Sequence, residues 1–459
     1  MNPLVDDRTG IVTRLSRTAP EPWWPRGLEV WSTHLADLSL HLPWPIDRVS
    51  TGTAFNDAER AQQSALGEAV ERYCGNFVPS TLRRAAYSKA GQDALAPSTF
   101  ALYSQNQYAE TGCPFLPFTH DLPVLWAQGT CLRDSSDASI PASLVYLNYH
   151  SGPRQMEPIT NFVMLAGIAA GQTPRAALTA SMEEIIERDA TVIWWANRLP
   201  TRPIDPADPQ LAGALIPAPE LGTGWAYGAG ASRICRYRLL SIPTVFDVTV
   251  SGVLLEDTDN RILMMGFAAR PDPATAVLKA LAEAVTLRYY ALGLLNPDGD
   301  IWVAAREGVI PIDFYKPFRS DRRYIDAYRA DFRDVADLGC HSQIWLDPRM
   351  RRYLEPVLGV GDPITLDQLP RITGDPFDAY LERFNGQGIE AYGVDVTTPD
   401  VAEAGLSVAR VIAPGTYSNA PAAFPLLGGS RLYTDPVKLG LRDRPIREED
   451  VNVAPLPHT

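Results

Sequence analysis

The sequence carries one pattern, Glu-x-x-Glu-Arg, twice within stretches that otherwise resemble buried helices. It occurs in "GEAVERY" (67–73) and again in "MEEIIERDA" (182–190). Positions i, i+3 and i+4 of an α-helix share a face, so each copy places two carboxylates and a guanidinium side by side. The flanking residues are mostly Ala, Val, Ile, Leu and Met, which indicates helices that are substantially buried. Any fold of this chain must therefore accommodate ionisable groups on two apolar helices.

Spacing alone leaves two interpretations of these glutamates open. Carboxylates at i and i+3 repel one another and resist desolvation unless a cation compensates them. In the first interpretation, each copy is a solvated helix edge whose arginine forms ion pairs within the helix. In the second, up to four carboxylates hold Mg²⁺, a hard cation that prefers oxygen ligands and usually keeps substrate phosphates as further ligands. Nearby arginines would then bind those phosphates.

Three long helices are predicted, and each has a start signal. The first begins at "ND" (56–57) and runs through "AERAQQSALGEAVERY". The second has Thr173 as its N-cap and Pro174 at its first helical position, and the third repeats this arrangement with Asp272 and Pro273. A polar cap followed by proline is typical of a helix N-terminus, because proline lacks only an N–H that would be unpaired there.

Strands are predicted between and after these helices. Stretches rich in Val, Ile, Leu and aromatic residues lie at 141–149, 246–269, 389–397 and 407–414. The second of these is interrupted by "EDTDN", which indicates a hairpin turn. The topology of residues 306–385 is not predicted. Helices and strands interleaved with hairpins indicate an α+β or mixed α/β fold.

The composition argues against several classes of protein. A formal net charge of -13 argues against a general nucleic-acid binder, because neutralising phosphates requires a basic surface. No apolar run approaches the ~20 residues that span a bilayer, and no secretory signal is expected. The five cysteines are widely spaced without a Cys-x-x-Cys pair, so neither a zinc site nor a disulfide framework is predicted. These features indicate a cytoplasmic protein.

Four ordered segments resemble the YcaO superfamily. Three of them match its signature segments: "STGTAFNDAERAQQSALGEAVERYCGN" (50–76), "AGIAAGQTPRAALTASMEEIIERDA" (166–190) and "GFAARPDPATAVLKALAEAVTLR" (266–288). The fourth, residues 388–436, resembles the closing region of the streptolysin-type (SagD-like) branch. Ordered blocks over roughly 48–459 are far more specific than a single motif. The resemblance implies a YcaO fold, in which sheets pack with helices around an ATP and Mg²⁺ site.

The resemblance implies an ATP- and Mg²⁺-dependent cyclodehydratase that acts on a ribosomally made precursor peptide. A Cys, Ser or Thr side chain adds to the preceding backbone carbonyl, and ATP phosphorylates the resulting oxygen. Phosphate then leaves to give a thiazoline or oxazoline. The phosphorylation is needed because an amide oxygen is otherwise a very poor leaving group.

Two alternatives accompany this reading. In the first, a YcaO enzyme activates an amide in the same way but forms a thioamide or a macrocyclic amidine. In the second, a degenerate, non-catalytic YcaO protein binds a peptide or a partner within a biosynthetic complex.

The resemblance also implies partners. A separate E1-like or ocin-ThiF-like protein that grips the leader peptide is expected, since family members without a fused partner usually depend on one. A flavin oxidase is a further candidate partner, and a homodimer is expected from family habit. Neither nucleic acid nor a membrane is expected as a partner.

Matching by position assigns roles to individual residues. The expected metal ligands are the paired glutamates of the first two helices, Glu68, Glu71, Glu184 and Glu187. Catalytic roles are expected for Arg188, which faces the phosphates in the family, and for Arg288. The expected cofactor-binding residues are Ser50, Ser64, Gln172, Arg188 and Glu283.

The chain departs from the family pattern at three places. Where the second helix begins, Gln172 and Ala176 stand in place of an Asn and a further metal-site Glu, and alanine cannot ligate a cation. Thr286 stands where Gln is common, and the chain ends in "NVAPLPHT" instead of a Pro-x-Pro-x-Pro tail. These departures favour the non-catalytic alternative, whereas the retained glutamates and Arg188 oppose it.

A division of the chain is predicted near residue 47. Residues 1–47, rich in Trp and Pro, are expected to form an ordered lead-in packed on a YcaO domain of residues 48–459. Trp194 and Trp195 are expected to pack against a sheet. His458 is expected to lie in a disordered last turn, with a role as a terminal acid or base as the alternative.

Overall fold

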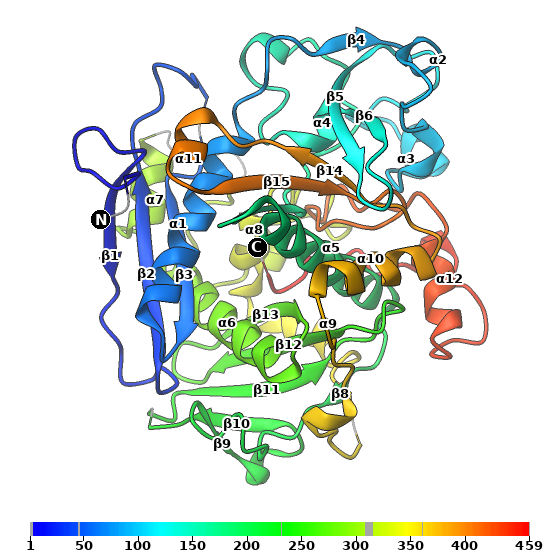
Figure 1. Cartoon of the computed structure of the whole chain (residues 1–459). Coiled ribbons are helices and arrows are strands. Elements are labelled where there is room, and N and C mark those ends of the chain that lie inside the picture. The colour runs from blue at the N-terminus through cyan, green and yellow to red at the C-terminus, as the bar shows by residue number, and fades with distance from the viewer. Residues whose placement is uncertain (1–2, 45, 231, 308–314, 360, 459) are drawn as a thin grey trace.

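The computed structural model of the chain describes residues 3–44, 46–230, 232–307, 315–359 and 361–458. Its strands form three sheets, and every pairing between named strands is antiparallel. Long helices lie between these sheets near the centre of the molecule (Figure 1). The mixed α/β architecture predicted from the sequence is therefore confirmed.

The first sheet is built largely by the segment that was predicted to be a lead-in. Its order is β1 (Val12–Arg17), β2 (Leu28–Leu35) and β3 (Val49–Phe55). Trp23 and Trp24, between the first two strands, are buried, and the Trp24 indole donates to the Tyr289 hydroxyl at 2.8 Å. The predicted boundary near residue 47 thus lies between two paired strands, and the division into two parts stays a prediction.

The second sheet contains the predicted hairpin. Its order is β13-β12-β11-β10-β9, and β8 pairs with β11. The strands are β8 (Arg202–Pro203), β9 (Leu215–Pro217), β10 (Trp225–Gly228), β11 (Cys235–Ser241), β12 (Thr249–Asp257) and β13 (Ile262–Arg270). Because β12 and β13 are adjacent and antiparallel, the turn predicted at "EDTDN" is confirmed.

The third sheet confirms two predicted strands and corrects a third. Its order is β4-β5-β14-β15-β7, and β6 pairs with β5. The strands are β4 (Arg83–Ala85), β5 (Val124–Cys131), β6 (Asp137–Pro141), β7 (Ile168–Gly171), β14 (Tyr392–Asp395) and β15 (Ser407–Ile412). The strand predicted at 141–149 is wrong, because helix α4 (Ala142–Val145) begins there. A short apolar run that is buried on all sides has no periodicity to distinguish the two structures.

The three predicted long helices are confirmed together with their caps. They are α1 (Ala58–Gly75), α5 (Pro174–Asn197) and α6 (Pro273–Leu295). The side chains of Asp57, Thr173 and Asp272 each accept a hydrogen bond from a backbone N–H three residues later. The remaining α-helices are shorter: α2 (Tyr87–Ala90), α3 (Gln105–Ala109), α7 (Asp300–Arg306), α8 (Gly339–Trp345), α9 (Arg351–Leu354), α10 (Pro376–Gly386), α11 (Pro399–Glu403) and α12 (Arg431–Lys438).

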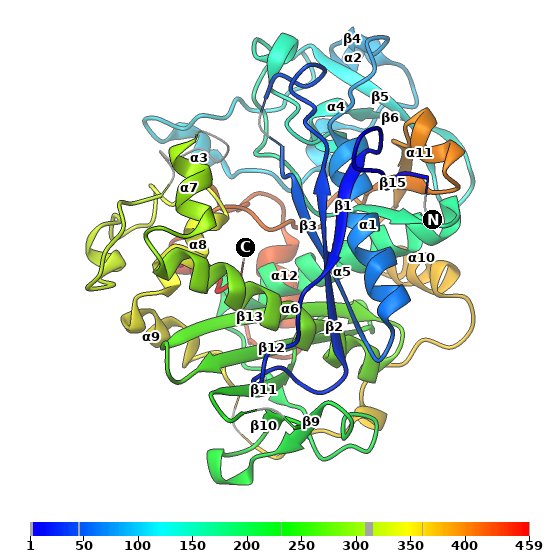
Figure 2. The same ribbon diagram turned by 90° about the vertical axis from the view of Figure 1, so that its left-hand side faces the viewer.

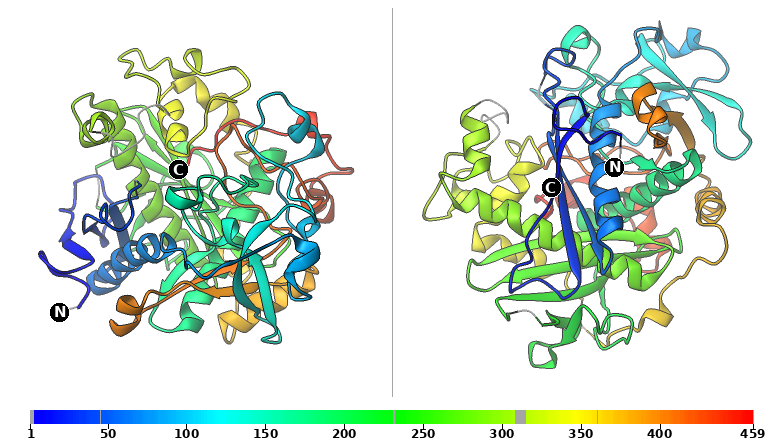
Figure 3. Two further views of the ribbon diagram at one scale, coloured as in Figure 1. Left: turned by 90° about the horizontal axis from the view of Figure 1, so that it is seen from above. Right: turned by 60° about the vertical axis from the view of Figure 1, so that its left-hand side comes forward.

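Each long helix connects two of the sheets. Helix α1 packs on β3 of the first sheet and on β7 of the third, whereas α5 packs on β7 and β15 of the third sheet and on β13 of the second. Helix α6 packs on β13 and β12 and also on β3. The turned views show α1 against the blue three-stranded sheet (Figure 3) and α6 across the second sheet (Figure 2). The three helices therefore surround one central region.

Glycines allow the helices to approach the strands closely. A Cβ at Gly52 of β3 would lie 2.0 Å from the Ala65 nitrogen of α1. A Cβ at Gly266 of β13 would lie 2.2 Å from the Ala280 oxygen of α6. These distances are far below any real contact, so only glycine permits this helix-to-strand spacing.

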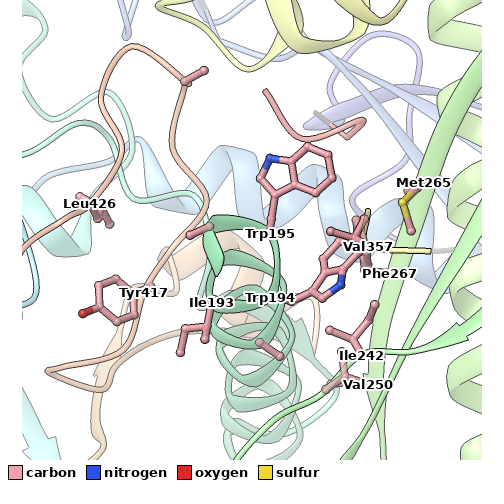
Figure 4. Close-up of a cluster of buried hydrophobic side chains, with 14 of the residues drawn as sticks. Ile193, Trp194, Trp195, Ile242, Val250, Met265, Phe267, Val357, Tyr417 and Leu426 are labelled. Carbon is pink, nitrogen blue, oxygen red and sulfur yellow. The ribbon is translucent and has the colours of Figure 1, made fainter. Parts of the chain in front are cut away.

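The last turns of α5 lie in the largest apolar cluster. Trp194 packs edge-on against Phe267 of β13, with ring centroids 5.9 Å apart, which confirms the predicted packing against a sheet. Figure 4 shows both indoles of this helix among side chains from β13 and from more distant segments. The indole of Trp195 donates to the Ala454 carbonyl at 2.6 Å, and that of Trp345 donates to Pro455 at 2.8 Å.

The residues up to His458 are therefore part of the core. The Met265 N–H of β13 also donates to the Pro457 carbonyl at 2.8 Å, and the His458 side chain is 4% exposed. The expectation of a disordered last turn is wrong, because indole and backbone donors from three separate elements hold this segment in place.

In the part of the chain that the structure describes, no helix has both the length and the apolar character needed to cross a bilayer.

Substituting Gly52 tests the close approach of α1 to β3. Gly52→Ala should lower the free energy of unfolding by about 2 kcal/mol or more, because the added methyl group meets helix backbone that cannot move independently. Gly213→Ala is the matched control, since a Cβ there meets nothing within 4 Å. Urea denaturation of both variants measures the difference. Equal stabilities would contradict this account of the packing.

Candidate functional site

Glutamates of all three long helices face the central region. Helix α1 contributes Glu68 and Glu71, α5 contributes Glu184 and Glu187, and α6 contributes Glu283. The charges of Glu68 and Glu184 act on Glu71, and those of Glu283 and Glu184 act on Glu187. The two Glu-x-x-Glu pairs are thus brought together with a fifth carboxyl group.

Four of these carboxylates accept a hydrogen bond from a strand or from the residue that precedes one. The pairs are Thr51 N to Glu68 Oε2 at 3.1 Å, Ala170 N to Glu71 Oε1 at 2.7 Å, Gly167 N to Glu184 Oε2 at 2.8 Å and Phe267 N to Glu283 Oε2 at 2.5 Å. Two of the donors, Thr51 and Phe267, are next to the close-contact glycines of β3 and β13. The tight packing therefore carries the strand amides to within reach of the helix carboxylates.

Burial strongly affects two of the glutamates. It raises the pKa of Glu71 to about 8; the N–H of Ala170 opposes the rise, and the charges of Glu68 and Glu184 add to it. Burial likewise raises the pKa of Glu187 to about 8, with Arg188 opposing the rise and Glu283 adding to it. Both groups thus favour the protonated form near neutral pH unless a further cation is present.

Arginine and lysine side chains lie among the carboxylates. The Arg188 guanidinium lies 3.4 Å from Glu187 and 3.9 Å from Glu283. The Lys279 ammonium donates to the Thr53 hydroxyl at 3.5 Å, and burial lowers its pKa although Glu283 opposes this. Arg188 was expected at the site from the sequence, whereas Lys279 was missed. It could have been noticed as a charged residue one turn before Glu283 on an otherwise apolar helix.

Two further arginines border the cluster. Arg270, at the end of β13, pairs with Glu183 at 3.2 Å, and the charge of Glu187 also acts on it. Arg72 pairs with Glu68 at 3.5 Å on α1. The first interpretation, in which the arginine forms an ion pair within its own helix, therefore holds for Arg72. This ion pair lies beside a site that is formed by residues of three helices.

His458 was missed as a site residue because it was expected in a disordered turn. Its Nε2 lies 2.8 Å from Arg188 Nη1 and 3.3 Å from Glu283 Oε1, and its ring stacks on Phe267. A guanidinium can only donate, so Nε2 is the acceptor. Burial holds the pKa of His458 well below its usual value, with Arg188 and His341 adding to the effect. A neutral imidazole therefore caps the arginine.

The structure does not bring every predicted residue into the cluster. Arg288 is buried elsewhere, where it donates to Asp257 at 2.7 Å and lies 3.9 Å from the centroid of the Trp23 ring. Positions 283 and 288 are five residues apart, which separates their directions by roughly 140° around the helix axis. Arg288 thus has a buried counter-ion of its own on a different face of α6 from Glu283.

The predicted cofactor-binding residues other than Arg188 and Glu283 lie at the margin. Ser50 is buried, and its hydroxyl has no hydrogen-bond partner among the described residues; it shares the face of β3 with Gly52, against α1. Ser64 is half-buried on α1, one turn before Glu68. Gln172 is exposed just before α5, and so is Ala176 in its first turn. The structure thus places no carboxylate at the position where the family has a further Glu.

The carboxylate oxygens of the cluster are of the kind that a hard divalent cation takes as ligands, although they do not converge on a single point. Among the described residues, no three Asp, Glu, His or Cys side chains converge as a ready metal cluster. Oε2 of Glu71 and Oε1 of Glu184 nevertheless accept no hydrogen bond within the described residues. Carboxylate oxygens of this kind are the ligands that Mg²⁺ takes, together with phosphate oxygens and water.

A comparison with protein families agrees with this site. Residues 54–417 match the model of the YcaO cyclodehydratase family, which is described as ATP- and Mg²⁺-binding. The chain belongs to the YcaO family. The prediction of ATP and Mg²⁺ as cofactors is confirmed at the level of that family, whereas the streptolysin-type branch stays a prediction.

Two curated relatives are similar in sequence. A protein of Rhizobium leguminosarum bv. trifolii, named for its position in the tfuA 3′ region, is 28% identical over 243 residues, which are 51% of this chain and 54% of that protein. A protein of Methanothermobacter thermautotrophicus is 24% identical over 368 residues, 78% of each chain. This YcaO protein thus spans about half the length of the rhizobial relative.

Solved structures confirm the fold. A heterocyclase in complex with substrate and cofactor superposes with a TM-score of 0.70 at 21% identity, covering 99% of this chain and 56% of that one. YcaO from Methanopyrus kandleri, bound with AMPPCP and Mg²⁺, superposes with a TM-score of 0.54 at 18% identity, and the match covers 90% of this chain and 91% of that one. A chain of the E. coli microcin synthetase McbBCD complex superposes with a TM-score of 0.53 at 12% identity, and the match covers 88% of each chain. The predicted YcaO fold is therefore confirmed.

The raised pKa of Glu187 predicts how stability depends on pH. The folded state keeps a proton up to about pH 8, whereas the unfolded chain releases it near the usual value of 4.5. The difference in proton affinity of Glu187 between the two states contributes to the stability of the folded state. This contribution is complete below pH 4.5 and is lost as pH rises through 8. In Glu187→Gln this contribution is absent. Between pH 5 and 8.5 the melting temperature of the metal-free variant should therefore fall by ~2 °C or more less than that of the metal-free natural protein. Differential scanning calorimetry measures this, with Glu382→Gln on the exposed side of α10 as control.

Proposed function

We propose that this YcaO protein is an ATP- and Mg²⁺-dependent enzyme that activates backbone amides of a ribosomal precursor peptide by O-phosphorylation. The observation that carries the proposal is the convergence of five glutamates from three helices with Arg188 and Lys279. Carboxylates hold a divalent cation, while arginine and lysine neutralise phosphate charge, and phosphoryl transfer needs both. A salt-bridged helix edge alone would not require buried, protonated carboxyl groups.

Different residues of the site would have different roles in this reaction. Glu68, Glu71, Glu184 and Glu187 would hold Mg²⁺, which supplies charge neutralisation for the transferring phosphoryl group. Arg188 and Lys279 bind phosphate oxygens and orient them. His458 orients Arg188 through its neutral Nε2, because burial disfavours the charged form of this imidazole and leaves it as a hydrogen-bond acceptor.

The product we favour is a thiazoline or oxazoline formed from Cys, Ser or Thr, as in the streptolysin-type branch. The resemblance of residues 388–436 supports this choice. The partners would then be the precursor peptide, an E1-like or ocin-ThiF-like protein that holds the leader, and a flavin oxidase. A thioamide or macrocyclic amidine would require the same amide activation, with a different nucleophile, so the geometry around Arg188 suits either chemistry.

A second candidate is a non-catalytic YcaO protein that binds peptide or partner. The exposed Ala176 favours it, because a ligand position of the family is vacant. The retained glutamates oppose it, since buried carboxyl groups destabilise a fold that has no cation to use them. We therefore keep amide activation as the proposed function.

Titration with MgATP distinguishes the two candidates. Glu184→Ala or Glu187→Ala should weaken MgATP affinity at least about tenfold, because each removes a charged ligand worth ~1.4 kcal/mol or more. Isothermal titration calorimetry measures the affinity, and Glu382→Ala, on an exposed face, should leave it unchanged. Absence of nucleotide binding by the natural protein at millimolar ATP would exclude the enzymatic proposal.

Restoring the missing carboxylate is a gain-of-function test. Ala176 lies on the same face of α5 as Glu187 but three helical turns, about 16 Å, closer to the N-terminus, so a glutamate there would extend the acidic face of this helix. Ala176→Glu should tighten Mg²⁺ binding several-fold in the presence of a non-hydrolysable ATP analogue. Ala176→Gln, of equal size without the charge, is the control. Equal affinities of the two variants would show that position 176 lies outside the metal site.

A further inference from the structure

Arg410 lies in the middle of β15 and is completely buried. Its guanidinium is surrounded by backbone carbonyls. Nε donates to Val145 at 2.9 Å, Nη1 donates to Ala166 at 2.5 Å and to Leu165 at 3.4 Å, and Nη2 donates to Met164. Three of the four acceptors belong to one short segment, residues 164–166, which leads into β7. The arginine therefore fixes the path of that segment.

This cation has no carboxylate within ion-pair distance among the described residues. A buried charge is normally paired directly, and carbonyl dipoles compensate only part of its lost hydration. Burial lowers the pKa of Arg410 to about 10, and the carboxylate that opposes this is Glu184. The counter-charge of Arg410 thus lies in the glutamate cluster, with one peptide group between the two side chains.

The peptide group between Ala166 and Gly167 connects the two charges. Its carbonyl accepts from Arg410 Nη1, and its N–H donates to Glu184 Oε2 at 2.8 Å. Both hydrogen bonds are charge-assisted, and each polarises the peptide in the direction that strengthens the other. The guanidinium therefore makes the Gly167 N–H a better donor for the carboxylate than an isolated amide would be.

Gly167 is the residue that this orientation of the peptide requires. Its φ is +88°, and a Cβ would lie 2.7 Å from the Val411 carbonyl. The next peptide is also fixed, because the Val411 N–H donates to the Gly167 carbonyl at 2.8 Å. Strand β15 therefore holds this turn through the Arg410 side chain and through the backbone of the following residue.

We propose that Arg410 is a positioning residue for Glu184, acting through the 166–167 peptide group to hold this carboxylate toward the metal site. The inference rests on the proposed function, because it assigns Glu184 to the divalent cation. Arg410 itself is completely buried, and its guanidinium donates to backbone carbonyls. Nothing in the spacing of the sequence indicates this role, because Arg410 is more than two hundred residues from Glu184.

Hydrogen exchange and metal binding test the proposal together. Arg410→Lys keeps the charge but cannot reach carbonyls on both sides, so the Gly167 amide should exchange at least about tenfold faster. The affinity for Mn²⁺, used as the probe metal and measured by electron paramagnetic resonance, should weaken at least about fivefold. Arg322→Lys is the matched control, since Arg322 likewise donates to several backbone carbonyls, those of Leu346, Asn260 and Arg261, and its substitution should change neither quantity.

Glu184→Gln tests the same connection from its other end. It leaves the carbonyl cage of Arg410 intact and removes only the negative charge, so the Gly167 amide should again exchange faster even if Arg410→Lys does not fold. Equal Gly167 exchange in Arg410→Lys and Arg322→Lys overturns the proposal, and so does a loosened amide with unchanged Mn²⁺ affinity. If the natural protein binds no Mn²⁺, the proposed function fails, while the exchange rates still decide whether Arg410 holds Glu184.

Discussion

The hydrogen bond from a strand amide to a helix carboxylate is the interaction on which the centre of this protein depends. A buried glutamate without a donor would cost several kcal/mol of desolvation. The bonds to Glu68 and Glu283 form where a glycine lets the helix backbone touch a strand. The same contacts that join the three sheets therefore hold the carboxylates, so the fold and the site cannot be separated energetically.

The electrostatics of the cluster follow from this arrangement. Glu71 and Glu187 favour the protonated form near neutral pH, because amides and nearby arginines only partly replace water. A divalent cation would release those protons and bind the ionised form, so metal binding and proton release are linked. Arg410 acts from outside the cluster, since its charge reaches Glu184 through a peptide group and does not neutralise it by direct pairing.

The sequence was sufficient for the local parts of this structure and insufficient for the long-range ones. Helix caps such as Thr173 and Asp272, and the two glutamate pairs, obey rules that involve only a few neighbouring residues. His458 was misjudged because the indoles that hold its segment come from residues more than a hundred positions away. Arg288 was expected at the site because it matches a motif, although its helical phase directs it elsewhere.

The vacancy at Ala176 has a bounded electrostatic effect. The cluster of five glutamates with Arg188 and Lys279 is bordered by Arg72 and by the Arg270–Glu183 ion pair, so the whole set contains six carboxyl groups and four cationic side chains. When all are ionised, two negative charges remain, which is the charge that one divalent cation neutralises. A glutamate at position 176 would raise this remainder and favour additional cationic charge. With alanine at position 176 the site therefore needs less positive charge for neutralisation than it would with glutamate, but it still needs a cation.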